Sequence, residues 1–343
     1  RSRRSQTDPL RQLQSGHAHR TRPRIASPLT TPNRLLLSSQ GIASNNIPEY
    51  ARRHIVESKR YQKKTRPRKE DHMQNTTLHI APHDIVVYEN DGSGPPIVFI
   101  HGNSGAGSIF SKQFEGVLAT HKIVSFDFPG HGGSSRASKP AEVYTLRGFA
   151  DVLVKLVQAK NLQKAVFVGL SLGGHILLEA TAQLTEAAGF VIHGTPPIAF
   201  PPAMQEAFLP HPSAAVNFKP DLNEEEKQLF LSGQFKPGTE TFPDTYKNAL
   251  EQTDPITRSS VAAGLGPGTY ADEIEVVGHL TQPLAVLHGE HDQLINLEYI
   301  KKLSMPTLWR EEVQIVKGAG HACQWEEASQ YNQLIYDFVA SLS

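Results

Sequence analysis

The chain has 343 residues, which is enough for one large domain or two small ones, and its formal net charge is zero. Its one cysteine, Cys323, excludes an intrachain disulfide and a metal site built from several thiolates. No apolar run approaches the ~20 residues that a membrane-spanning helix needs, so we expect no membrane span.

The zero net charge hides two chemically different segments. Residues 1–72 contain 17 Lys and Arg against 5 Asp and Glu, whereas residues 73–343 contain 17 against 29. The first segment has no Phe or Trp and cannot bury enough apolar surface to offset its ordering entropy, so we expect it to be disordered. Its composition is typical of a transit peptide, of a segment that binds nucleic acid or an anionic membrane, or of a solvated tail.

These two segments lead to expectations about location and partners. We expect a cytoplasmic protein, or an organelle-targeted one if residues 1–72 act as a transit peptide. The acidic segment should repel the phosphate backbone of a nucleic acid, so we expect it to have no nucleic-acid partner. We expect its partner to be a small-molecule substrate. The sequence leaves the oligomeric state open.

From residue 77 on, apolar runs typical of strands alternate with amphipathic segments typical of helices. In chain order we predict two strands that form a hairpin in 77–90, a strand at 96–102, a helix at 108–119, a strand that enters a glycine-rich loop in 122–134, a helix at 146–161, a strand at 164–170, a helix at 173–184 and a strand at 189–194. Residues 195–280 break this alternation. It resumes with strands in 283–292 and 311–321 and a helix at 326–342. We therefore predict that residues 73–343 form an α/β domain with a mostly parallel central sheet, helices on both faces and an inserted cap at about 200–270.

Polar residues follow the predicted strands. In an open parallel sheet the active site lies beyond the carboxyl ends of the strands, so these loops are where chemistry is expected. The chemically capable residues in them are His101, Asn103, Asp127, Ser171, His193, Asp292 and His321.

Ser171 is the strongest candidate nucleophile. It stands in the pattern Gly169-x-Ser171-x-Gly173, between an apolar strand and a helix. A sharp strand-to-helix turn lifts such a serine out of the backbone, and the helix N-terminus favours negative charge beside it. The alternative is an ordinary turn without chemistry. We also expect the glycines, Gly174 included, to leave a floor without side chains under a rigid substrate ring.

A serine hydroxyl needs a base, and in this architecture the acid and then the histidine follow the nucleophile along the chain. His321 is the one histidine after Asp292, although a surface histidine would fit the same pattern. The orienting carboxylate is Asp292 or Glu290. We favour Asp292, because three residues past Gly289 is the usual offset from the strand end.

The oxyanion that forms on a substrate needs two donors, and we expect the main-chain amides of Leu172 and Asn103 to supply them. His101 is assigned to packing behind the Asn103 loop. The other histidines of this region and the cysteine receive no catalytic role: His131, His175, His193 and Cys323. His175, four residues after Ser171, could still touch the site from one side of the helix.

Several motifs together resemble a known family. They are "HGNSGAGSIFSKQFEG" (101–116), "DFPGHGGS" (127–134), "GLSLGGHI" (169–176), "HGTPPIA" (193–199) and "GAGH" (318–321). Over about 77–343 the chain resembles the α/β-hydrolase superfamily and, within it, the serine-dependent N-acyl-homoserine lactonases, which open a lactone ring without a metal. The resemblance implies the α/β-hydrolase fold and no cofactor. It places a triad on Ser171, Asp292 and His321, with oxyanion amides at Asn103 and Leu172.

Two features depart from those lactonases. They carry Glu as the acid where this chain has Asp292, and the cap matches them only in patches such as "EQTDPITR" (251–258). The cap nevertheless offers apolar side chains for an acyl chain, although for most of them we favour the alternative that they only pack the cap against the sheet: Phe200, Met204, Phe208, Leu209, Phe218, Phe230 and Phe235.

We therefore predict a serine hydrolase of carboxylic esters or lactones that opens N-acyl-homoserine lactones and so quenches quorum signals. A general carboxylesterase, a lipase-like enzyme and a carbon–carbon bond hydrolase are alternatives, and a non-catalytic ligand-binding scaffold is a more distant one. Ser171 argues against relatives of this fold that use an Asp nucleophile. The run "HGEHDQ" (288–293) lacks the ligand spacing of two-metal lactonases, so we expect no metal dependence.

Overall fold

The computed structural model describes residues 73–342. The expectations for residues 1–72, disorder and targeting among them, concern a segment outside these described residues. No helix in the described part of the chain is long and apolar enough to cross a membrane.

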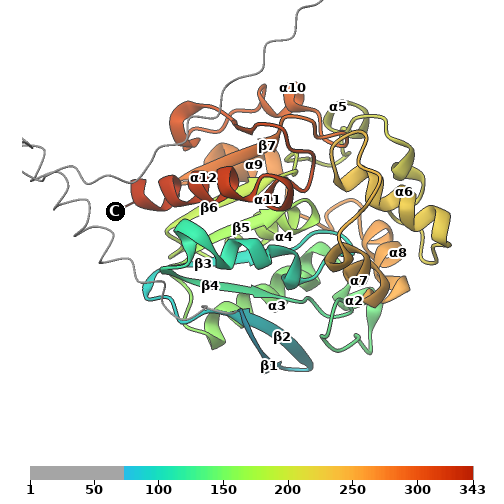
Figure 1. Cartoon of the computed structure of the whole chain (residues 1–343), viewed down its shortest axis with the longest axis horizontal. Coiled ribbons are helices and arrows are strands. Elements are labelled where there is room, and N and C mark those ends of the chain that lie inside the picture. The colour runs from blue at the N-terminus through green and yellow to red at the C-terminus, as the bar shows by residue number, and fades with distance from the viewer. Residues whose placement is uncertain (1–72, 343) are drawn as a thin grey trace, which may run out of the picture. The chain divides into compact units, whose positions relative to one another are not determined.

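An eight-stranded sheet runs through the described residues (Figure 1). Its strands are β1 (Gln74–Ile80), β2 (His83–Glu89), β3 (Gly94–Ile100), β4 (His121–Phe126), β5 (Val166–Leu170), β6 (Gly189–His193), β7 (Leu284–Gly289) and β8 (Gln314–Val316). They lie in the order β1-β2-β4-β3-β5-β6-β7-β8. β2 pairs antiparallel with both β1 and β4, and every other pair is parallel. The predicted hairpin and the mostly parallel sheet are confirmed.

The central strands are mostly apolar because helices cover both faces of the sheet. Every residue of β5, β6 and β7 is buried. One apolar core holds side chains of α3 (Leu146–Ala159), α4 (Leu172–Ala180) and α9 (Glu273–His279). A second core holds side chains of η1 (Gly107–Phe114), α11 (Cys323–Glu326) and α12 (Ala328–Ser341). Helices on both faces of the sheet are therefore also confirmed (Figure 1).

Some elements differ from the prediction at their ends. The segment 108–119 forms two 3₁₀ helices, η1 and η2 (Gly116–Leu118), because Gly116 adopts a φ of 67° where the second begins. The strand predicted in 311–321 is short, because Gly318 turns the chain with a φ of 75°. The last helix is divided at Glu327, whose φ of −125° is not helical. Short helices elsewhere are α2 (Pro140–Val143), α10 (Leu297–Ile300) and η4 (Trp309–Glu311).

Between β6 and β7 the chain forms a helical insertion, residues 194–283. Before α9 the insertion contains α5 (Met204–Ala207), η3 (Pro212–Ala215), α6 (Glu224–Gln234), α7 (Asp244–Gln252) and α8 (Pro255–Ala263). Asn223 and Glu226 form a reciprocal capping box at the start of α6. Asp254 caps α8, whose first residue is Pro255. Figure 1 shows α6, α7 and α8 gathered at one end of the sheet.

A chain that begins at Met73 should keep this fold, because residues 73–342 include all eight strands and both apolar cores described above. We expect its melting temperature, measured by differential scanning calorimetry, to lie within about 3 °C of that of the full chain. Its rate of p-nitrophenyl butyrate hydrolysis should be unchanged. A larger fall in either quantity would show that residues 1–72 support the domain.

Candidate active site

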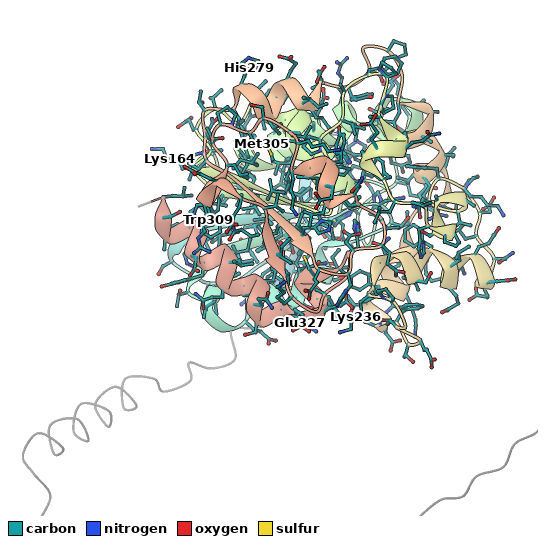
Figure 2. The ribbon with its side chains drawn as sticks, turned by 90° about the horizontal axis from the view of Figure 1, so that it is seen from above. Lys164, Lys236, His279, Met305, Trp309 and Glu327 are labelled. Carbon is teal, nitrogen blue, oxygen red and sulfur yellow. The ribbon has the colours of Figure 1, made fainter. Side chains whose placement is uncertain are left out.

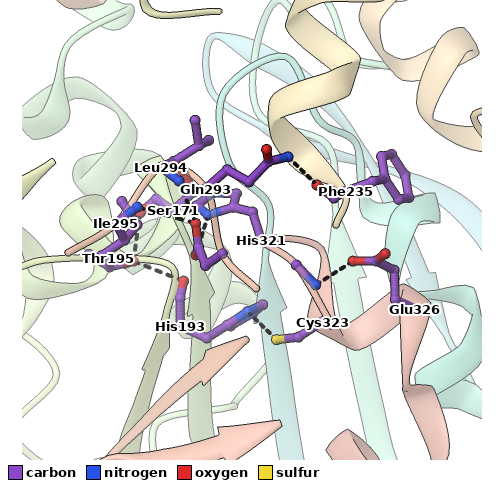
Figure 3. Close-up of polar contacts among 12 residues, drawn as sticks. Ser171, His193, Thr195, Phe235, Gln293, Leu294, Ile295, His321, Cys323 and Glu326 are labelled. Atoms are coloured by element: carbon purple, nitrogen blue, oxygen red, sulfur yellow. Dashed lines mark hydrogen bonds and ion pairs between the residues drawn. The ribbon is translucent and has the colours of Figure 1, made fainter. Parts of the chain in front are cut away.

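Ser171 lies in the turn between β5 and α4, with φ 53° and ψ −123°. Such a conformation costs a non-glycine residue about 1–3 kcal/mol and persists only where the surroundings hold it. The Ser171 N–H donates to the His193 carbonyl at 2.9 Å. The Ser171 carbonyl accepts from the Gly174 N–H at 2.8 Å and from the Thr195 hydroxyl at 2.9 Å (Figure 3). Hydrogen bonds to β6 and its following loop therefore hold the strained turn.

The glycines of this turn are required by close packing. A Cβ on Gly169 would lie 2.6 Å from the Gly174 Cα. One on Gly173 would lie 2.4 Å from the Ile100 carbonyl oxygen, and one on Gly174 would lie 2.1 Å from Thr195 Oγ1. All three glycines face other parts of the protein. The expectation that they form a floor under the substrate is therefore wrong, and their role is to let the turn approach its neighbours.

Asp292 holds the His321 ring. His321 Nδ1 lies 2.8 Å from Asp292 Oδ2, and both side chains are 1% exposed. Because an ionised carboxylate only accepts, Nδ1 carries the hydrogen and Nε2 is left as the basic nitrogen. The other Asp292 oxygen accepts from the main-chain N–H groups of Leu294 at 2.8 Å and Ile295 at 3.2 Å. Burial works to raise the pKa of Asp292, but the charge and hydrogen bond of His321 outweigh it and hold that pKa below its ordinary value.

The alternative carboxylate, Glu290, lies elsewhere. Its Oε1 is 3.0 Å from Lys317 Nζ, and its Oε2 accepts from the Gly318 N–H at 2.9 Å. Among the described residues it makes no hydrogen bond to His321. Of the two carboxylates weighed from the sequence, the structure brings Asp292 to the histidine.

Ser171 and His321 line the same cavity, which has a volume of about 320 Å³. Asn103 and Leu172 line it as well, so four of the predicted site residues meet there. His321 Nε2 is buried and has no hydrogen-bond partner within residues 73–342, Ser171 included. Bonds of this kind are often long before a substrate binds and tighten in the complex.

Two main-chain N–H groups beside Ser171 are free to bind an oxyanion. They belong to Asn103, which follows β3, and to Leu172, which begins α4. Neither donates a hydrogen bond to another residue in the described part of the chain. The Asn103 side chain is engaged, because its Nδ2 donates to the Asn217 carbonyl at 2.8 Å. Unpaired main-chain donors in this position can stabilise an oxygen that gains negative charge.

Arg258 in α8 ties the insertion to the Asn103 loop, and the sequence analysis did not identify it. The guanidinium is buried and donates to the carbonyls of Lys219, at 2.8 Å, and Pro220. It also donates to Ser104 Oγ at 3.2 Å, and Ser104 donates to Asn103 Oδ1 at 3.2 Å. Arg258 lies in the quoted patch "EQTDPITR", but that patch does not reveal which loop the guanidinium reaches.

The cavity wall is mostly apolar. Five of the seven cap side chains considered for an acyl chain line it: Met204, Phe208, Leu209, Phe218 and Phe230. The expectation that most of the seven only pack the cap against the sheet is therefore wrong. The other two do not line the cavity. Phe235 packs on the rings of Phe242 and Tyr246, while Phe200 is 45% exposed beside Tyr270. The remaining apolar lining comes from Leu146, Leu172, Ile198, Ala214, Val261, Leu265, Leu294 and Ile295.

The histidines assigned to structure are buried: His101, His131 and His193. His101 Nε2 accepts from the Phe128 N–H at 3.1 Å, and its Nδ1 donates to the Gly102 carbonyl at 2.9 Å. Burial lowers the pKa of His101 to about 4 and that of His193 to about 3. Cys323 Sγ lies 3.5 Å from His193 Nδ1, and burial raises the pKa of the thiol (Figure 3).

Two further residues from the predicted loops have clear partners. Asp127 accepts from the main-chain N–H groups of Gly107 at 2.7 Å and Gly133 at 2.9 Å, so it ties two loops together behind the cavity. His175 lines the cavity and pairs with the buried Glu273. Within residues 73–342, no group of three or more His, Cys, Asp or Glu side chains could hold a metal ion.

Gly194, the residue after β6, supports the His321 ring, and the sequence analysis did not identify it either. Its φ is 60°, and a Cβ there would lie 2.6 Å from His321 Cε1. A glycine after a strand is visible in the sequence. The ring that it touches comes from the other end of the domain, so only the folded chain reveals the contact.

Comparisons with known proteins agree with this architecture. The model of a family described as the alpha/beta hydrolase fold matches residues 95–328. A pimeloyl-[acyl-carrier protein] methyl ester esterase of Xylella fastidiosa is 27% identical, over 74% of this chain and 98% of its own. A 2-hydroxy-6-oxononadienedioate/2-hydroxy-6-oxononatrienedioate hydrolase of Dechloromonas aromatica is 24% identical, over 75% of this chain and 91% of its own.

Among solved structures, the chain resembles the N-acyl homoserine lactonase AidH. A mutant of AidH complexed with N-hexanoyl homoserine lactone is 28% identical, with a TM-score of 0.75 over 79% of this chain and 99% of that chain. AidH complexed with N-butanoyl homoserine gives the same TM-score. The resemblance stated from the sequence motifs is therefore confirmed.

Replacing Gly194 with Ala should displace the His321 ring and lower kcat for p-nitrophenyl butyrate on the order of 10²-fold, because small misplacements of a reacting group are costly. Gly268 is the matched control, since its φ is 69° but a Cβ there would have no atom within 4 Å. Gly268→Ala carries the same backbone penalty and should keep kcat. Equal activity of the two variants would show that the position of His321 does not matter for hydrolysis.

The buried histidines should make the fold sensitive to acid. In the unfolded chain they take up protons near the ordinary pKa of 6.5, whereas folded His101 and His193 do so only near pH 4 and pH 3. The unfolded state therefore binds more protons between these values, and the free energy of unfolding falls as the pH drops from 7 towards 4. At pH 5 the free energy of unfolding is lower than at pH 7.5 by about 2 kcal/mol for each of these two histidines. Urea denaturation at pH 7.5 and pH 5 measures it, and equal free energies would contradict the assignment of neutral buried rings.

Proposed function

The chain belongs to the α/β-hydrolase fold family, and we propose that it is a serine hydrolase that opens the ring of N-acyl-homoserine lactones. Hydrolysis of carboxylic ester bonds follows from the family and from similar proteins named as an esterase and a lactonase. The catalytic residues are inferred from the geometry of the cavity, and the lactone substrate from its apolar lining together with the likeness to AidH.

One observation carries the proposal: the strained Ser171 turn and the His321 ring, bonded to Asp292, face the same apolar cavity. A serine hydroxyl is a weak nucleophile until a base takes its proton. His321 Nε2 is free for this task because Nδ1 is occupied by Asp292. The ionised carboxylate also stabilises the imidazolium that forms when Nε2 is protonated.

In the first step, Ser171 Oγ forms a bond to the carbonyl carbon of the substrate while His321 Nε2 takes the hydroxyl proton. The carbonyl oxygen becomes an oxyanion, which the main-chain N–H groups of Asn103 and Leu172 bind. Loss of one such donor typically costs about 10²–10³ in turnover. The N-terminus of α4 adds a favourable potential at the same place.

Collapse of the oxyanion breaks the ring C–O bond, and His321 passes its proton to the departing ring oxygen. This oxygen stays attached to the acyl part as a hydroxyl group. Water then attacks the acyl-enzyme and gives a proton to Nε2, and Ser171 leaves and recovers that proton. The net reaction adds water to the lactone and releases a single hydroxy acid.

The cavity supports an acyl chain as part of the substrate. Its lining is mostly apolar and includes phenylalanines of the insertion, so each buried CH₂ group of a chain would contribute about 0.8 kcal/mol. None of the residues 73–342 that line the cavity is Lys or Arg. A dicarboxylate of the kind named for the Dechloromonas hydrolase would find no cationic partner there, which argues against the carbon–carbon bond hydrolase. The likeness to AidH supports a lactone over a simple ester.

Asp292→Asn should lower kcat for p-nitrophenyl butyrate on the order of 10⁴-fold, because the amide would hold His321 in the wrong tautomer. Glu290→Gln should stay within about twofold of the wild type, since a surface ion pair has little effect. Steady-state kinetics of both variants test this pair of expectations. A reversed ranking would identify Glu290 as the residue that orients the histidine.

The wild type should convert N-hexanoyl-homoserine lactone into N-hexanoyl-homoserine, with no change in rate when a chelator is added and with a rate that depends on acyl-chain length. Ser171→Ala should be slower on the order of 10⁴-fold or more. Mass spectrometry of the products decides the outcome. Hexanoic acid and homoserine lactone would indicate amide cleavage, and p-nitrophenyl ester hydrolysis without lactone turnover would indicate a general carboxylesterase.

A further inference from the structure

A second histidine–carboxylate pair lies at the same cavity. His175 is on α4, four residues after Ser171, and its Nδ1 is 2.8 Å from Oε2 and 2.9 Å from Oε1 of Glu273. The His175 side chain is 11% exposed and the Glu273 side chain 2% exposed. The mechanism proposed for Ser171 and His321 does not use this pair.

Glu273 anchors the His175 ring in one orientation. It is the first residue of α9, and its Oε2 accepts from the Ile198 N–H at 2.9 Å. Its own N–H donates to the Ile198 carbonyl at 3.0 Å, so the carboxylate joins α4, α9 and the loop after β6. Because an ionised carboxylate only accepts, His175 Nδ1 carries the hydrogen.

The other ring nitrogen, His175 Nε2, is left for a ligand. It has no hydrogen-bond partner among residues 73–342, and the ring lines the cavity together with Ser171. Apart from the residues of the proposed mechanism, the other polar side chains of the cavity belong to the insertion: His211, Asn217 and Gln234. His175 is thus the polar side chain that α4 presents in a mostly apolar cavity wall, with Nε2 available to a ligand.

His175 and Ser171 line the same cavity, so a substrate that Ser171 attacks lies in the cavity that the His175 ring also lines. In an N-acyl-homoserine lactone the amide is attached to the ring carbon next to the carbonyl that Ser171 attacks, so the amide stays close to the reacting carbonyl. An amide suits either state of the ring, because a neutral Nε2 accepts from its N–H and a protonated Nε2 donates to its carbonyl.

We infer that His175 is a specificity determinant that binds the substrate amide through Nε2 and so selects lactones with an amide at the α-carbon over simple alkyl lactones. This inference rests on the proposed function. Glu273 acts through His175 as a positioning residue.

The test compares N-hexanoyl-homoserine lactone with α-heptyl-γ-butyrolactone, in which two CH₂ groups replace the amide. The ratio of the two kcat/KM values measures the preference of the enzyme for the amide. In His175→Leu this ratio should fall about tenfold or more, which is the effect of one lost hydrogen bond. A ratio within about twofold of the wild type would overturn the inference, even if both kcat/KM values fall.

Two further variants show whether a change in the ratio comes from the lost histidine or from a protein that fails to fold. His175→Leu combined with Glu273→Gln removes the charge that the leucine would leave unpaired and keeps an oxygen for the Ile198 N–H. This double variant should show the same loss of preference. His279→Leu makes the same substitution at an exposed position of α9, which Figure 2 places at the periphery of the molecule, and should leave the ratio unchanged.

Binding measurements test the role of His175 even if the proposed hydrolysis of lactones is wrong. If the wild type opens neither lactone, the proposed function is wrong. Isothermal titration of both lactones into Ser171→Ala, with and without His175→Leu, then still decides the role of the histidine. The dissociation constant of N-hexanoyl-homoserine lactone, divided by that of α-heptyl-γ-butyrolactone, should rise about tenfold with His175→Leu, and an unchanged ratio overturns the inference.

Discussion

The backbone conformation of Ser171 is the constraint on which the rest of the site depends. The positive φ turns the chain from β5 into α4 within one residue, which exposes the hydroxyl and leaves the Leu172 N–H without an intrahelical partner. The turn is held from the neighbouring strand, because β5 and β6 end in register at Leu170 and His193. A side chain at Gly174 would push against Thr195 and disturb this contact. The Ser171 turn is therefore held rigidly to the central sheet.

Residues of the helical insertion make hydrogen bonds to the polar groups around Ser171. Arg258 reaches from α8 to Ser104 and so fixes the loop that carries the Asn103 amide. Glu273 reaches from α9 to His175, which lines the same cavity as Ser171. The insertion thus does more than provide an apolar wall. Its position and the geometry of the polar groups around Ser171 are coupled through buried hydrogen bonds.

Much of the fold and the Ser171 turn could be predicted because their signals are local, and His321 could be grouped with Ser171 from the order of the acid and the histidine along the chain. Apolar runs mark the buried strands, and glycines two residues before and two residues after a serine mark the turn. Gly194 and Arg258 could not be found in this way, because their importance arises from contacts with residues far along the chain. The position of Phe235 could not be predicted for another reason, because an apolar side chain in an insertion packs helices together as readily as it lines a cavity.

Reaction with a fluorophosphonate tests whether His321 activates Ser171, because the reagent bonds to a serine only where a neighbouring base activates it. We expect one adduct, located by tandem mass spectrometry on the proteolytic peptide that contains Ser171. We also expect His321→Gln to form this adduct far more slowly while its circular dichroism is unchanged. A protein that hydrolyses p-nitrophenyl butyrate yet remains unlabelled at Ser171, or carries the label on another residue, would show that Ser171 is not the nucleophile.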